Sequence, residues 1–81
     1  GFEGLAYMNG LIYLLDGFIK DDIVVYDPVL RTIVNVLDVD GINGGFGLDL
    51  TGGLAPNPAR NSLYVSSTFS DQIFEISAKS G

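Results

Sequence analysis

The stretch from Gly4 to Asp27 reads GLAYMNGLIYLLDGFIKDDIVVYD, and a related stretch from Gly53 to Ser77 reads GLAPNPARNSLYVSSTFSDQIFEIS. The Gly-Leu-Ala start, the central tyrosine and the closing Asp-x-Ile run return in the same order, roughly 50 residues later. An internal repeat of this length is typical of a solenoid or a propeller, whose single units cannot bury their apolar faces alone. The repeat therefore predicts units that pack against one another.

The composition agrees with units that bury apolar surface against neighbours. The chain has 81 residues, enough for one small domain. Hydrophobic residues make up 47% of it and charged residues only 17%, against roughly 25% charged in an average domain. Such a chain is too apolar to be disordered. The apolar excess predicts faces that are covered by neighbouring units rather than by water.

The charge distribution argues against two classes of partner. The net charge is -6, and the four basic residues (Lys20, Arg31, Arg60 and Lys79) are scattered along the chain. Neutralising the phosphates of a nucleic acid needs clustered bases, so we expect no nucleic-acid partner. An acidic surface also disfavours anionic membranes, and no apolar run approaches the ~20 residues that span a bilayer. We therefore expect no membrane association.

Short β-branched and aromatic runs, separated by turn residues, predict an all-β first half. Asn9-Gly10 is a strong two-residue hairpin signal because both positions tolerate positive φ. Pro28 ends a strand because it cannot donate to a ladder. In the last run, alternation places Thr32, Val34 and Val36 on one face and Ile33, Asn35 and Leu37 on the other. The predicted strands are Gly4 to Met8, Leu11 to Asp16, Asp22 to Tyr26 and Thr32 to Val39.

The second half repeats the plan after a Gly-rich crossover from Asp40 to Gly47. A short strand is expected from Gly52 to Ala55, and the Pro- and Asn-rich residues 56–61 predict a turn. Two further strands are expected from Ser62 to Ser67 and from Gln72 to Ser77. The fourth strand of this copy is expected to be missing. We therefore divide the chain into a first unit at residues 1–50 and a second at 51–81.

These motifs resemble those of a known family. Gly4-Leu5-Ala6, Leu11-Ile12-Tyr13-Leu14 and Asp22-Ile23-Val24-Val25-Tyr26-Asp27-Pro28, with their second copies, are similar to the repeats of NHL- and YVTN-type β-propellers. The resemblance covers nearly the whole chain apart from residues 37–50. It implies β-propeller blades of four-stranded antiparallel sheets. It also implies a secreted or periplasmic bacterial protein, or an engineered derivative of one, and no particular substrate.

A propeller usually has four to eight blades, so two blades need completion. The partners expected are copies of this chain in a closed homo-oligomer or adjacent blades of a longer propeller, and an open sheet or sandwich is the third outcome. The small Gly4, Ala6, Gly53 and Ala55 suit a crowded innermost strand. The tyrosines, with Tyr13 and Tyr64 at mid-strand, are expected to pack within and between blades rather than to form a ligand platform.

The best candidate for a metal site is a calcium loop formed by Asp38, Asp40 and Asn43. Carboxylates at alternate positions, followed by Gly and Asn, can wrap oxygens around Ca²⁺. The full EF-hand spacing is absent, because no Glu lies twelve positions along the loop. The alternative is that Asp-Gly and Asn-Gly form two tight turns. No other cofactor is expected.

The inventory for catalysis is poor. The chain has no His and no Cys, which excludes the usual catalytic triads, imidazole metal sites and disulfides. Paired carboxylates could still supply acid and base, and Asp16 and Asp22 are the nearest such pair. We expect a non-catalytic propeller unit that acts as a scaffold or a recognition surface. The alternative is a two-blade piece of a secreted propeller hydrolase of the lactonase or phytase type.

Overall fold

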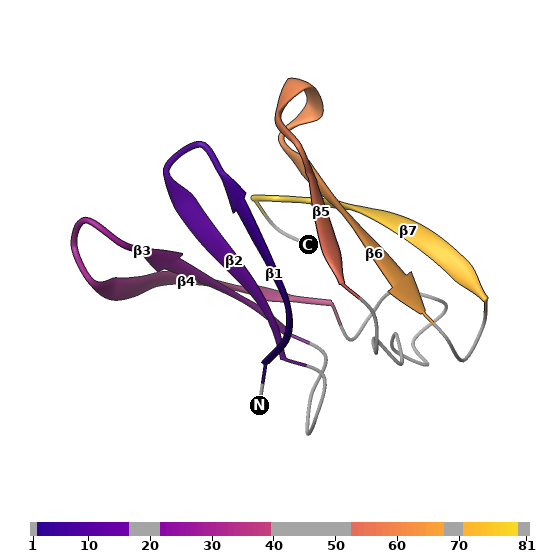
Figure 1. Ribbon diagram of the computed structural model, residues 1–81, viewed down its shortest axis with the longest axis horizontal. Coiled ribbons are helices and arrows are strands. Elements are labelled where there is room, and N and C mark those ends of the chain that lie inside the picture. The colour runs from indigo at the N-terminus through magenta and orange to yellow at the C-terminus, as the bar shows by residue number, and fades with distance from the viewer. Residues whose placement is uncertain (1, 17–21, 40–52, 68–70, 80–81) are drawn as a thin grey trace.

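A computed structural model describes residues 2–16, 22–39, 53–67 and 71–79 of the chain (Figure 1). The described residues form an all-β structure with one short 3-10 helix, which confirms the expected class. The strands are β1 (Phe2–Met8), β2 (Leu11–Asp16), β3 (Asp22–Asp27), β4 (Thr32–Asp38), β5 (Leu54–Asn57), β6 (Ser62–Ser67) and β7 (Gln72–Ser77).

The strands form two separate antiparallel sheets. The first sheet has four strands in the order β1-β2-β3-β4, and the second has three in the order β5-β6-β7. Within each sheet, strands that are consecutive in the sequence are paired. Figure 1 shows the two sheets beside each other, with β1 and β5 as the strands that approach across the gap.

The turns of the first sheet follow their local sequence signals. Asn9 and Gly10 connect β1 to β2 with φ values of 53° and 81°, both in the left-handed region that a type I′ hairpin needs. After β3, the Asp27 Oδ1 atom accepts hydrogen bonds from the backbone N–H groups of Val29 (2.9 Å) and Leu30 (3.1 Å). An aspartate in this role holds a tight turn and needs no tertiary support.

A bulge changes the expected faces of β4. Val25 on β3 pairs with Asn35, but the next residue, Tyr26, pairs with Ile33, so Val34 has no partner. The expected alternation holds from Asn35 to Asp38 and is wrong before the bulge, where Ile33 pairs with Tyr26 and lies on the face of Val36. Only Leu37 is buried, whereas Ile33 is 59% exposed. An extra residue in one strand reverses the faces on one side of the bulge.

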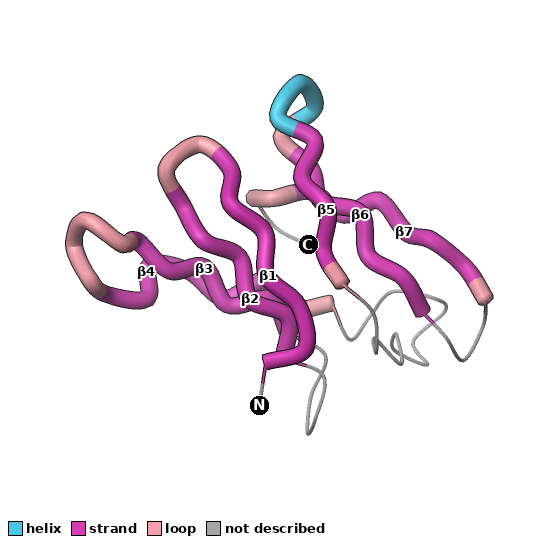
Figure 2. The backbone as a smooth tube through the Cα atoms, in the orientation of Figure 1, coloured by secondary structure: helices cyan, strands magenta, loops and turns pink. Residues whose placement is uncertain are grey.

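The turn predicted at residues 56–61 begins too early. β5 continues through Pro56 to Asn57, and the 3-10 helix Pro58–Arg60 makes the actual connection (Figure 2). Pro56 fits there because β5 is the edge strand of its sheet, where a missing N–H is tolerated. Asn61 closes the helix with φ 47°, and its carbonyl accepts a 3.0 Å hydrogen bond from the N–H of Ala78.

One hydrophobic core joins the two sheets. From the first sheet it includes Leu15, Ile23 and Leu37, and from the second Leu63 and Ile76, each at most 1% exposed. Leu54 and Phe74 pack against its margin. Because this core lies between the sheets, neither sheet has a complete core by itself. The complete buried apolar set is Ala6, Met8, Tyr13, Leu15, Ile23, Val25, Leu37, Val39, Leu63, Val65, Ile76 and Ala78.

Candidate functional site

The sequence repeat is also a repeat of strand register. In the first sheet Leu5 pairs with Leu14 and Leu14 with Val24; in the second the corresponding row is Leu54, Val65 and Phe74. We name the face that carries these rows the leucine face of each sheet. The opposite face carries the rows Ala6, Tyr13 and Val25 in the first sheet and Ala55, Tyr64 and Glu75 in the second. We name it the alanine face.

The two sheets bury opposite faces. In the first sheet the alanine face is covered, with Ala6 at 4% exposure and Tyr13 at 3%. In the second sheet the leucine face is covered, with Leu63 at 0% and Val65 at 1%. The interface inside the chain therefore joins the alanine face of the first sheet to the leucine face of the second. One face of each kind points outward.

The outward leucine face of the first sheet is a broad apolar surface. Leu5 is 61% exposed, Tyr7 62% and Val36 50%. Ile12, Leu14, Val24 and Tyr26 are half-buried beside them. Exposed apolar patches of this kind mark interaction sites in soluble proteins. This surface was not predicted from the sequence, although the alternation of Leu5 and Tyr7 with Ala6 and Met8 is its signal.

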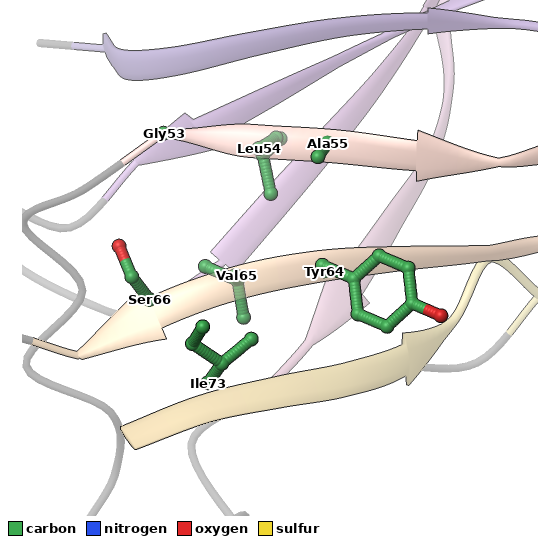
Figure 3. Close-up of a pocket in the computed structure, with 7 residues that line it drawn as sticks. All are labelled: Gly53, Leu54, Ala55, Tyr64, Val65, Ser66 and Ile73. Carbon is green, nitrogen blue, oxygen red and sulfur yellow. The ribbon is translucent and has the colours of Figure 1, made fainter. Parts of the chain in front are cut away.

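The outward alanine face of the second sheet is hollowed. Gly53, Ala55, Tyr64, Ser66 and Ile73, with Leu54 and Val65, line an open cavity of 320 Å³ on β5, β6 and β7 (Figure 3). Its walls are mainly apolar, and Ile73 at its edge is 76% exposed. A Cβ atom on Gly53 would meet no atom within 4 Å. The crowding expected at Gly53 is therefore not present within this chain.

The tyrosines differ in burial according to the face on which they lie. Tyr13 lies in the core between the sheets, as predicted. Tyr64, its equivalent in the second copy, lies half-buried at the cavity, and its hydroxyl accepts a 3.0 Å hydrogen bond from Asn57 Nδ2. Tyr7 is exposed and Tyr26 half-buried. Packing between sheets is therefore confirmed for Tyr13 alone.

Burial raises the pKa of the Tyr13 hydroxyl above its ordinary value of 10.0, because desolvation disfavours the phenolate. The folded state then holds this proton more tightly than the unfolded state does. Stability from this group is complete below pH 10 and decreases as the pH rises through and above that value. We expect Tyr13→Phe to lessen the loss of stability in alkali, as measured by urea unfolding at neutral and alkaline pH. Equal alkaline losses in Tyr13→Phe and in Tyr7→Phe, a control at an exposed tyrosine, would contradict this.

A small polar network borders the alanine face of the second sheet. Glu75 Oε2 accepts a 2.6 Å hydrogen bond from the hydroxyl of Ser62 and forms a 2.9 Å ion pair with Arg60 Nε. Ser62 is only 5% exposed, whereas the Arg60 side chain is 69% exposed. The buried hydroxyl therefore depends on Glu75 more than the exposed guanidinium does.

We expect Glu75→Ala to destabilise the fold by about 1–3 kcal/mol, because it removes the acceptor of a buried hydroxyl. Arg60→Ala is expected to change the free energy of unfolding by less than about 1 kcal/mol, since exposed ion pairs contribute little. Urea denaturation of both variants checks the order. A larger effect at Arg60 than at Glu75 would show that the ion pair dominates.

Three acidic residues meet at one end of the first sheet. Asp22 pairs in register with Asp16 on β2 and with Asp38 on β4, so the carboxylate pair expected from the sequence is brought together. Asp22 Oδ1 is buried without a hydrogen-bond partner, whereas Asp16 and Asp38 each have interactions of their own. Within the described ranges, no group of three or more acidic residues is arranged to hold a metal ion.

The proposed calcium loop is only partly described. Asp38 ends β4 with an exposed side chain, whereas Asp40 and Asn43 lie outside the described residues, as does the Gly-rich crossover. The calcium loop therefore stays a prediction. A calcium titration followed by thermal melting tests it, and an unchanged melting temperature at saturating Ca²⁺ would remove it.

Comparisons with protein-family models, with curated proteins and with solved structures found no match for this chain. Across residues 2–16, 22–39, 53–67 and 71–79, no helix is long and apolar enough to cross a membrane.

Proposed function

We propose that the two sheets are consecutive blades of a β-propeller and that the chain is a non-catalytic scaffold unit. The observation that carries this proposal is that the second sheet repeats the strand pairing of the first. Equivalent residues occupy equivalent rows in both sheets, and the sheets pack face to face with β1 beside β5. Radial repetition of small antiparallel sheets is the plan of a propeller.

The resemblance to NHL- and YVTN-type repeats also supports the proposal that the sheets are propeller blades. It also supports a secreted or periplasmic setting and a role as a scaffold or a recognition surface. The chain's partners are then blades of its own kind. Nucleic acids and membranes remain outside the proposal because of the net charge of -6.

Linking copies of this chain in one polypeptide tests the blade proposal. In a repeat protein each added unit contributes an interface with its neighbour, so stability rises with the number of copies until the ring closes. We expect two, three and four linked copies to unfold at increasing urea concentrations. Linked copies that unfold at the same midpoint as the single chain would show that the sheets do not stack as blades.

The alternative is a propeller hydrolase of the lactonase or phytase type. The row of Asp16, Asp22 and Asp38 is the observation that favours it, because adjacent carboxylates can share acid and base roles. Assays with a lactone and with a phosphomonoester, with and without Ca²⁺, separate the two functions. We expect no turnover; turnover that is lost in Asp22→Asn would establish the hydrolase instead.

A further inference from the structure

The inward and outward faces of this chain are repeats of each other. Ile73, exposed at 76%, occupies in the second sheet the place that the fully buried Ile23 occupies in the first. Leu5, exposed at 61%, occupies in the first sheet the place of Leu54, which packs on the core. These two outward residues thus have equivalents that are covered inside the chain.

The internal interface shows what covers such faces. It joins one alanine face to one leucine face, with Ala6 and Tyr13 on one side and Leu63 and Val65 on the other. The two outward faces are the remaining alanine face and the remaining leucine face. They correspond in position to the two faces that meet inside the chain, with Glu75 in the place of Val25 and Ser66 in the place of Leu15, and they lie on opposite sides of the same chain.

We propose that the outward leucine face of one copy binds the outward alanine face of a second copy, head to tail. The contact repeats the interface that joins the two sheets within the chain, and it rests on the proposed function, since it treats the sheets as blades. Leu5, Tyr7 and Leu14 of one copy then lie against Ala55, Tyr64 and Ile73 of the next. The cavity on the second sheet receives these side chains, as a hollow lined mainly by apolar groups suits them.

A head-to-tail contact uses two different surfaces, so it forms rings when its rotation closes and filaments when it does not. A ring of four to eight blades takes two to four copies of a two-blade chain. Because each copy carries a net charge of -6, the copies repel one another. Salt screens this repulsion, so the assembly strengthens with ionic strength.

The mass in solution is the first test. Sedimentation equilibrium of the unchanged chain is expected to give a closed assembly of two to four copies, at lower protein concentration when salt is added. A single-chain mass at the highest soluble concentration, together with a cooperative melt, would overturn the proposal. The linked-copy experiment distinguishes failure of the head-to-tail proposal from failure of the blade proposal. If the single chain is monomeric but its linked copies gain stability, the sheets are still blades.

Two variants test the head-to-tail geometry. Leu5→Glu blocks the leucine face and Ile73→Glu blocks the alanine face, each at an exposed position that folding leaves in water. For each variant alone, we expect self-association to be weakened at least about a hundredfold, because the new carboxylate would be buried in the contact without a partner. Their mixture is expected to form a dimer of one variant with the other and nothing larger, since one intact face of each kind remains.

A matched control and an alternative geometry complete the test. Leu30→Glu changes an equally exposed leucine (66%) in the β3–β4 turn, away from both faces, and is expected to assemble as the unchanged chain does. If two leucine faces bound each other instead, Ile73→Glu would still dimerise while Leu5→Glu would not, and the proposal would be wrong. Circular dichroism of each variant verifies that it is folded.

Discussion

Replacing Leu15 by Ala is expected to destabilise the folded chain by about 2–5 kcal/mol. Leu15 is 0% exposed and lies on β2 opposite Ile23, in the core that joins the two sheets. Truncating a buried leucine loses its transfer free energy and leaves a cavity that the surroundings fill only in part. Since small domains are stable by only about 5–15 kcal/mol, this single change removes a large part of the total.

Urea denaturation followed by circular dichroism measures this loss. Leu63→Ala, in the second sheet, should produce a loss of similar size, because both leucines belong to one core. Leu30→Ala is the control, since this leucine is 66% exposed in a turn and its removal should change stability by no more than about 0.5 kcal/mol. If either core variant left the other sheet folded in a separate transition, the core would not be shared.

The second large effect compares two alanines that the repeat makes equivalent. Ala6 is 4% exposed between the sheets, whereas Ala55 is exposed on the outward alanine face. Ala6→Leu forces three additional carbons into a packed core and is expected to cost about 1–3 kcal/mol. Ala55→Leu adds the same carbons to an open surface and should leave the unfolding of a single chain unchanged within about 0.5 kcal/mol.

The same pair of variants also reports on assembly. On the head-to-tail proposal, Ala55 in a ring has the surroundings that Ala6 has within the chain. Ala55→Leu should therefore leave the dilute, monomeric chain as stable as before and reduce the sedimentation mass at high concentration. If Ala55→Leu had no effect on mass, the second sheet would not be covered as the first sheet is.

The strands were predictable where local chemistry defines their ends. β2, β6 and β7 match the predicted ranges because apolar and β-branched runs stop at Gly, Asp or Ser residues. The error at Pro56 arose because a proline is read as a strand breaker, and only the sheet order shows that β5 is an edge. The bulge at Val34 could not be predicted either, because it depends on the pairing with β3.

The candidate site was predictable only in its parts. Asp16 and Asp22 were identified as a carboxylate pair from their nearness in sequence, and the β2–β3 register places them opposite each other. The third acid in the row, Asp38, was grouped with Asp40 and Asn43 as a calcium candidate instead, because the pairing of β4 with β3 is not visible in the sequence. The network of Ser62 with Glu75 was missed for the same reason, since thirteen residues separate its members.

The repeat, the strands and the turns follow from the sequence alone, because residue alternation, Asn-Gly signals and β-branched runs act over a few neighbours. Which face of each sheet is buried follows only from the tertiary structure. Both faces of both sheets carry apolar residues, so the alternation in the sequence defines two faces but does not indicate which of them is buried. Tyr13 and Tyr64 occupy equivalent positions, yet only Tyr13 is buried, because a face is covered when a neighbouring sheet lies on it.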